Sequence, residues 1–148
     1  MATTQLLIVD DEERFLKTTK FLLENKKCGV FTAINGLSAM EILKNKRMDV
    51  VILDVKMPGL DGVEVLRRIK KKHPLVEVIM LTGHSTTESA IEGLKLGAFD
   101  YLIKPCDIPI LLEKVKEAHD KKLAMEEKIR QVKIDKIISH PLEVFEKD

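Results

Sequence analysis

Acidic side chains follow directly after two of the most apolar runs in the chain. Asp10 and Asp11 follow QLLIV at 5–9, and Asp54 follows VVIL at 50–53. Carboxylates that meet in one place repel each other, so some would be protonated unless a cation lies among them. Mg²⁺ is suited to that place, because it takes one or two carboxylates and shares its other positions with water and phosphate oxygens. If the fold unites these acids, they can bind Mg²⁺ beside a phosphoryl group.

Two further polar side chains come at the ends of later β-rich runs. Thr82 follows VEVIML at 76–81 and precedes Gly83, whose lack of a side chain lets the backbone approach a ligand. Lys104 follows DYLI at 100–103. Phosphoryl transfer requires mainly positioning and the balancing of charge on the equatorial oxygens. Mg²⁺, the ammonium and the hydroxyl would each take one oxygen, and a carboxylate beside the metal would be the nucleophile, giving an aspartyl phosphate.

The elements that must position these side chains alternate between strand and helix. Strands are expected at 5–9, 30–34, 50–53, 76–81 and 100–103. The first, third and fourth are continuously apolar, which is typical of parallel strands that are covered on both faces. Stripes with helical spacing lie between them: Phe15, Thr19, Leu22 and Leu23, then Ala39, Met40 and Leu43, then Val63, Leu66 and Ile69, then Ala90, Ile91 and Leu94.

This alternation predicts an α/β fold in which helices wind around both faces of a five-stranded parallel sheet. The carboxyl ends of all strands then lie along one edge, where such sheets bind their ligands. Strands one, three, four and five would bring their terminal polar residues to that edge. The fold therefore makes neighbours of residues that are far apart in the sequence.

Four segments together resemble the receiver domains of two-component response regulators, the superfamily of the chemotaxis protein CheY. They are VDDE at 9–12, LDVKMPGLDG at 53–62, LTGH at 81–84 and GAFDYLIKP at 97–105, within a similarity that covers about residues 5–120. The stretch from 81 to 105 is closest in character to receivers of the NtrC and DctD type. The resemblance implies a flavodoxin-like sheet of order 2-1-3-4-5, a receiver domain at 1–120 and a helical extension at 121–148.

The resemblance also implies a metal site with assigned roles. Asp54 matches the phosphoacceptor, and Asp11 matches the direct metal ligand. Asp10 matches a neighbouring acid that acts largely through water. Lys56 matches the position whose backbone carbonyl completes the metal site, and Mn²⁺ would be an acceptable substitute for Mg²⁺.

The remaining roles concern the response to phosphorylation. Thr82 and Tyr101 match the family's switch pair, in which the hydroxyl turns toward the phosphoryl group and the ring swings inward. Lys104 matches the lysine that pairs with the phosphate, and its bond to Pro105 resembles the family's cis peptide, which an X-Pro bond adopts at low energetic cost. Lys56 and His84 occupy positions that tune the lifetime of the phosphate in this family.

The activity implied is the transfer of a phosphoryl group to Asp54 from a phosphohistidine on a sensor histidine kinase or phosphotransfer protein. The chain would be a cytoplasmic switch rather than an enzyme, although it would assist its own phosphorylation and slow dephosphorylation. Phosphorylation would change a surface that binds a partner or a second copy.

Other functions fit the residues less well. A hydrolase of the haloacid dehalogenase type would need a second acid two residues after the nucleophile, where this chain has Lys56. A flavin or dinucleotide binder would need a phosphate-binding loop after the first strand, where the sequence is the acidic DDEER. The formal net charge is +1 and no apolar run could span a bilayer, so we expect no direct nucleic-acid or membrane partner.

A helical pattern begins at Ile108 and continues past the expected end of a receiver. No glycine occurs from 107 to 148, which predicts one helix to about Ser139. Its apolar residues recur in steps of three and four with Lys122 at the seam: Ile108, Leu111, Val115, Ala118, Met125, Ile129 and Val132. The second half would either pair as a short coiled coil with a second copy or a partner, or be a frayed helix whose pattern arises by chance.

Two interpretations of the whole chain remain open. It is a stand-alone receiver, or it is the N-terminal receiver of a longer DNA-binding transcriptional regulator whose output domain is absent from this sequence.

Overall fold

The computed structural model describes residues 3–57, 59–83 and 87–139. Strands and helices alternate, as the sequence predicts. The elements are β1 (Gln5–Val9), α1 (Glu13–Glu24), β2 (Gly29–Ala33), α2 (Gly36–Asn45), β3 (Val50–Leu53), α3 (Gly62–Lys72), β4 (Glu77–Thr82), α4 (Thr87–Lys95), β5 (Asp100–Ile103) and α5 (Ile108–Ser139). Within this part of the chain, no helix combines the length and the apolar character needed to cross a bilayer.

The five strands form one parallel sheet in the order β2-β1-β3-β4-β5, which confirms the predicted order. Val9 at the end of β1 pairs with Leu53 at the end of β3. The backbone N–H of Asp54 continues that ladder by donating to the carbonyl of Val9 at 3.0 Å. The residues that follow β1 and β3 therefore come out at the same edge of the sheet.

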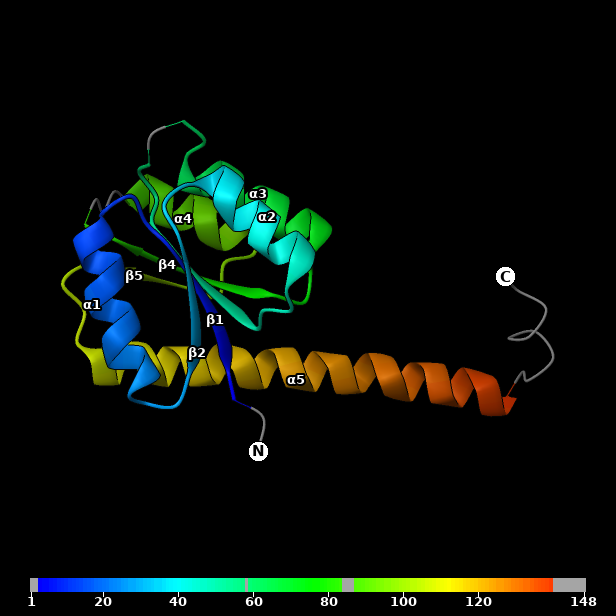
Figure 1. The fold of residues 1–148 in the computed structure, drawn as a ribbon. Coiled ribbons are helices and arrows are strands. Elements are labelled where there is room, and N and C mark those ends of the chain that lie inside the picture. The colour runs from blue at the N-terminus through cyan, green and yellow to red at the C-terminus, as the bar shows by residue number, and fades with distance from the viewer. Residues whose placement is uncertain (1–2, 58, 84–86, 140–148) are drawn as a thin grey trace.

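Helices cover both faces of the sheet, with α1 and α5 on one side and α2, α3 and α4 on the other (Figure 1). Alternate residues of β1 enter opposite cores. Leu7 and Val9 face the cluster that contains α2 and α3, whereas Leu6 and Ile8 face the cluster that contains α1 and α5. Burial on both faces explains why the strands are apolar without alternation.

The start of α3 fixes the chain next to Asp54. The side chain of Asp61 caps this helix by accepting from the N–H of Glu64 at 3.0 Å. The first residue of the helix is Gly62, and a Cβ there would collide with the carbonyl oxygen of Asp54 and with the Cα of Val55. Only glycine allows α3 to begin so close to the end of β3.

Three details differ from the expectations. β2 begins and ends one residue earlier than predicted, so Ile34 lies outside it and is 48% exposed. β4 is shifted by one residue and includes Thr82. The predicted stripe of α4 is wrong, because Ile91 and Leu94 are about half exposed. Among the residues of α4 whose burial is described, Gly93 is the buried one, and an added Cβ there would lie within 4 Å of side chains of β4 and α3.

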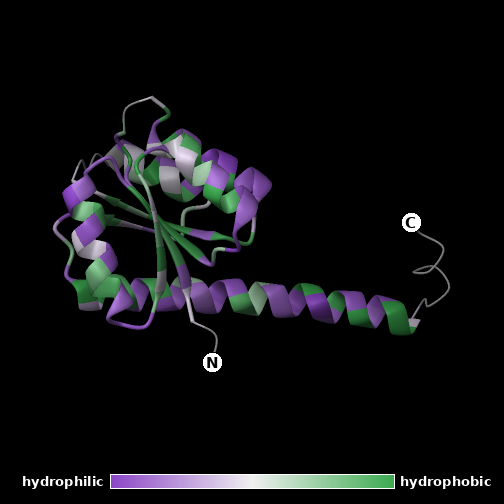
Figure 2. Cartoon of the chain, in the orientation of Figure 1, coloured by the Kyte–Doolittle hydropathy of each residue, from purple (hydrophilic) through white to green (hydrophobic). Residues whose placement is uncertain are grey.

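The long C-terminal helix is confirmed. The first half of α5 packs on the sheet through Leu111, Val115 and Ala118, all about 1% exposed or less. The second half continues past the edge of the sheet, and apolar and polar residues alternate along it (Figures 1 and 2). Its exposed apolar side chains include Met125, Ile129, Val132, Ile134, Ile137 and Ile138.

Two ion pairs at the amino edge of the sheet, one of them buried, fasten the middle of α5. Asp49, just before β3, accepts from the Lys122 ammonium at 3.1 Å, and their side chains are 11% and 4% exposed. Glu77 at the start of β4 lies 3.5 Å from the Lys121 ammonium. These four residues, which we call the amino-edge cluster, lie at the opposite end of the strands from Asp54. They attach α5 to the sheet beyond residue 120.

Candidate metal centre and phosphoryl site

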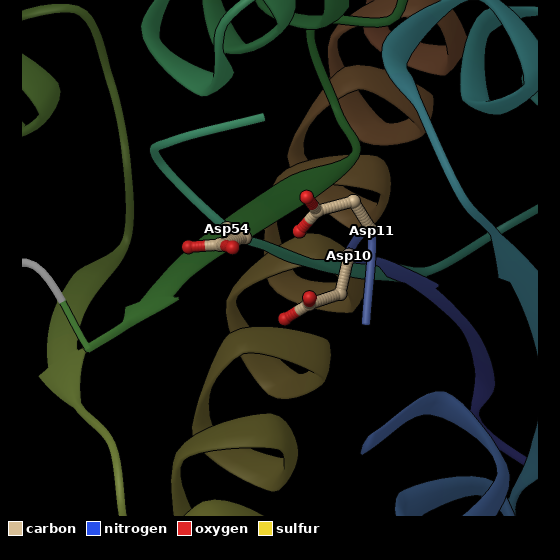
Figure 3. A group of neighbouring side chains, drawn as sticks. All are labelled: Asp10, Asp11 and Asp54. Carbon is tan, nitrogen blue, oxygen red and sulfur yellow. The ribbon is translucent and has the colours of Figure 1, made fainter. Parts of the chain in front are cut away.

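Three carboxylates meet at the carboxyl edge of the sheet. One ligand oxygen from each of Asp10, Asp11 and Asp54 lies within 4.8 Å of the other two. Figure 3 shows the three side chains, two from the end of β1 and one from the end of β3. Asp10 and Asp54 are buried, with 1% and 5% exposed, whereas Asp11 is exposed to solvent. The fold thus unites the acids that the sequence selects.

This donor set fits a hard divalent cation. One oxygen of Asp54, Oδ1, is buried and accepts no hydrogen bond from the residues that the structure describes. Leaving a buried acceptor unpaired costs about 1–3 kcal/mol, more for a charged group, so a cation there would be stabilising. Two oxygens on opposite sides of Mg²⁺ are about 4.2 Å apart. A small closure, or one bridging water, would therefore bring all three carboxylates of Asp10, Asp11 and Asp54 to one ion.

The Lys104 ammonium lies beside these acids. Its Nζ is 2.5 Å from Oδ2 of Asp10 and 3.4 Å from Oε1 of Glu12. The other oxygen of Asp10 accepts from the N–H of Glu12 at 2.9 Å, which fixes the carboxylate. The ring centroid of Phe15 lies 4.0 Å from Nζ. Lys104 therefore supplies the positive charge that the sequence predicts at this edge.

Burial and charge shift the titration of this pair. Burial raises the pKa of Asp10, and this outweighs the hydrogen bond from Lys104 that would lower it. Burial also works to lower the pKa of Lys104, but the hydrogen bond and charge of Asp10, with the charges of Asp54 and Glu12, hold it above its ordinary value. Lys104 is accordingly a persistent cation beside Asp10.

Thr82 and Tyr101 belong to the paired strands β4 and β5. Thr82 is the fully buried last residue of β4, and its carbonyl accepts from the N–H of Lys104 at 2.8 Å. Tyr101 is half-buried in β5. Burial raises the pKa of its phenol, and the negative charge of Asp54 raises it further. Tyr101 is thus within electrostatic reach of the predicted phosphoacceptor.

Lys56, Gly83 and Pro105 lie in the loops that follow β3, β4 and β5. Lys56 follows β3 and has an exposed side chain, which lines a polar groove of about 380 Å³ between α3 and α4. Among the described residues, none would lie within 4 Å of a Cβ added at Gly83. The Lys104–Pro105 peptide is cis, as the resemblance implies. His84, expected to tune the phosphate lifetime, lies outside the described residues.

Sequence analysis did not foresee two contacts of Lys104. Glu12 was included only in the acidic segment after the first strand, and Phe15 only in the apolar stripe that predicts α1. The prediction for Phe15 is confirmed, since Phe15 packs against the core between the sheet and α5. That the same side chains also touch Lys104 depends on how α1 is placed beside β5, which periodicity does not report.

With this geometry established, comparison with known proteins identifies the family. Residues 6–116 match the family described as the response regulator receiver domain, which is most of the chain. The chain belongs to that family. It is a CheY-like receiver domain of two-component signalling. The fold and the family that the sequence predicts are both confirmed.

The relatives include transcriptional regulators. The receiver is 39% identical over 113 residues to the transcriptional regulatory protein ZraR of Klebsiella oxytoca, covering 76% of this chain and 26% of that protein. It is 39% identical over 105 residues to the DNA-binding transcriptional regulator NtrC of Escherichia coli K12, covering 68% and 22%. The chain thus spans about a quarter of the length of these relatives.

Solved receiver domains share the architecture. A CheY-like receiver domain protein from Methanospirillum hungatei superposes with a TM-score of 0.81 at 31% identity, covering 84% of this chain and 99% of that one. The match extends over nearly the whole of that domain.

Proposed function

We propose that this receiver accepts a phosphoryl group on Asp54 from a phosphohistidine of a sensor histidine kinase or phosphotransfer protein. The observation that carries the proposal is a buried oxygen of Asp54, within a group of three carboxylates, that accepts no hydrogen bond from the described residues. An oxygen of Asp54 attacks phosphorus, the P–N bond to the donor imidazole breaks, and its electron pair returns to the ring nitrogen.

The residues around Asp54 position the incoming group. Asp10, Asp11, Asp54 and the backbone carbonyl of Lys56 would hold Mg²⁺, or Mn²⁺ in its place. When bound, the metal neutralises charge on the phosphoryl oxygens. Lys104, which already carries its proton beside Asp10, pairs with a second oxygen. The neighbouring carboxylates repel a phosphoryl donor that carries no metal, because both are negatively charged. The donor would therefore bind only when Mg²⁺ is present.

Phosphorylation then acts as a switch. The hydroxyl of Thr82 turns to bind a phosphoryl oxygen. The ring of Tyr101 then moves inward into the space that the Thr82 hydroxyl has left. The change alters the surface formed by α4, β5 and α5. The chain is therefore a signalling switch in the cytoplasm rather than an enzyme, although its own residues assist both phosphorylation and slow hydrolysis. Lys56 and His84 would set the lifetime of the phosphate.

Mg²⁺ uptake tests the metal assignment. We expect one Mg²⁺ per chain in isothermal calorimetry, and we expect Asp11→Asn to weaken binding at least about tenfold, because one charged ligand is lost. Asp61→Asn is the matched control, since it makes the same change in a nearby acid and keeps a good helix cap. Equal Mg²⁺ affinity for Asp11→Asn and the wild type would refute the assignment.

The exposed apolar residues of the second half of α5 support a homodimer. Because Met125, Ile129 and Val132 continue a coiled-coil spacing and are 38–66% exposed, pairing with a second copy would bury them. We expect multi-angle light scattering to give a dimer for the full chain and a monomer for residues 1–128, which keep the amino-edge cluster. A monomeric mass for the full chain as well as for residues 1–128 would contradict the homodimer.

A second candidate function is suggested by the relatives. Since the chain spans only 22–26% of regulators that include a DNA-binding protein, it would act as the receiver of a longer transcriptional regulator. The intact mass of the native protein, isolated with an antibody against the receiver, distinguishes the two: a mass of 16.8 kDa supports the stand-alone receiver.

A further inference from the structure

The ammonium of Lys104 lies over the ring of Phe15, in the first turn of α1. Nζ is 4.0 Å from the ring centroid, inside the about 6 Å within which an aromatic face attracts a cation. The same nitrogen contacts Asp10 and Glu12. Two carboxylates and one aromatic face therefore hold this side chain, which is 15% exposed.

These contacts would respond differently when the site is phosphorylated. Under the proposed function, Lys104 must leave Asp10 for an oxygen of the phosphoryl group on Asp54. A lysine side chain has about 2 kcal/mol of rotamer entropy to lose when it is positioned again. The face of Phe15 attracts the ammonium without a directed hydrogen bond, so it continues to restrain Lys104 while the anionic partner changes. Phe15 can do this because its ring packs against the core.

We infer that Phe15 is a positioning residue for Lys104, and that its ring strengthens phosphoryl binding at Asp54. The inference rests on the proposed function. Phe15→Leu keeps the apolar bulk and removes the aromatic face. We expect it to bind a phosphoryl analogue about threefold to tenfold more weakly, the range for one partly buried cation–π contact. Mg²⁺ alone should keep its affinity, because Lys104 is not a metal ligand.

The probe is beryllium fluoride added in the presence of Mg²⁺, since beryllium trifluoride adds to a carboxylate oxygen in the geometry of a phosphoryl group. The chain has one tyrosine and no tryptophan, so intrinsic fluorescence reports on Tyr101 at the site. Phe31→Leu is the matched control, because Phe31 makes a similar contact with Lys46, 5.0 Å from the ring centroid, on the edge strand β2. Thermal unfolding establishes that each variant is folded.

A series of fluorinated phenylalanines at position 15 separates electrostatics from packing. Successive ring fluorines weaken the negative face while the ring keeps its shape, so we expect affinity to fall step by step. Weaker binding by Phe15→Leu, with this graded loss and an unaffected Phe31→Leu, supports the inference. Unchanged affinity in Phe15→Leu overturns it, and so does a flat fluorination series. A wild-type chain that binds Mg²⁺ but no beryllium fluoride, or binds neither, would instead contradict the proposed function.

Discussion

Asp54→Asn is expected to incorporate no phosphoryl group from radiolabelled acetyl phosphate in the presence of Mg²⁺. An amide oxygen is a far weaker nucleophile than a carboxylate. Among the described residues, Asp54 is the member of the three-carboxylate group with a buried oxygen that accepts no hydrogen bond. In metal-free buffer the same variant should unfold at a higher temperature than the wild type. The reason is that it removes one of three carboxylates whose oxygens lie within 4.8 Å of one another.

The control for this variant is again Asp61→Asn. Asp61 lies on the same loop but caps α3, and an asparagine caps a helix about as well. It should therefore label like the wild type and show no gain in stability without metal. Labelling of Asp54→Asn at the wild-type level would mean that another residue accepts the phosphoryl group. If Asp54→Asn neither labels nor gains stability, Asp54 is the nucleophile but repulsion among the three carboxylates does not destabilise the metal-free fold.

Truncation after residue 120 is expected to destabilise the domain strongly, by about 3–5 kcal/mol, the usual cost of removing one partner of a buried ion pair. The truncation removes Lys122, the ammonium partner of the buried Asp49, whereas Glu77 loses Lys121 but keeps Lys70 at 3.7 Å. Truncation after residue 128 retains the whole amino-edge cluster, so it should unfold like the full chain when both are measured at a concentration low enough to keep the full chain monomeric. Urea denaturation followed by circular dichroism measures both. Equal stability of the two truncated chains would show that the cluster does not fasten α5.

Point variants isolate the pair at the centre of this cluster. Lys122→Met keeps the length of the side chain and leaves Asp49 without its ammonium, so it should lose much of the same stability. Adding Asp49→Asn should restore part of the loss, because the uncompensated charge is removed. Lys128→Met is the control at an exposed position of the same helix and should unfold like the wild type. If the prediction holds, the folded unit extends past residue 120 to about Glu126, which also contacts Lys122.

Comparison of the two ends of the sheet shows what the sequence can predict. At the carboxyl edge, four candidate residues end or directly follow a recognisable strand, so Asp10, Asp54, Thr82 and Lys104 can be selected from strand ends alone. Parallel topology then makes them neighbours without any knowledge of side-chain contacts. The site was predictable because backbone position alone determines it.

The amino edge was less predictable, because there side chains reach from helices to the strand starts. Lys122 breaks the apolar seam of α5, and nothing in the spacing shows that it faces the buried Asp49. Lys70 belongs to the run of three lysines in the last turn of α3, where solvated cations are the usual pattern. Its ammonium instead donates to the carbonyls of Pro74 and Val76, and burial lowers its pKa. Periodicity predicts which face of a helix is apolar, but it does not show which polar side chain is enclosed.

The position of the phosphoryl group tests the central claim most directly. The full chain is incubated with acetyl phosphate and Mg²⁺ and then treated with borohydride, which reduces an aspartyl phosphate to homoserine. Peptide mass spectrometry should find homoserine at position 54, and none when Mg²⁺ is removed by a chelator. Homoserine at another acid, or equal conversion of Asp54 without the metal, would contradict the assignment of Asp54 as the phosphoacceptor of a Mg²⁺ site.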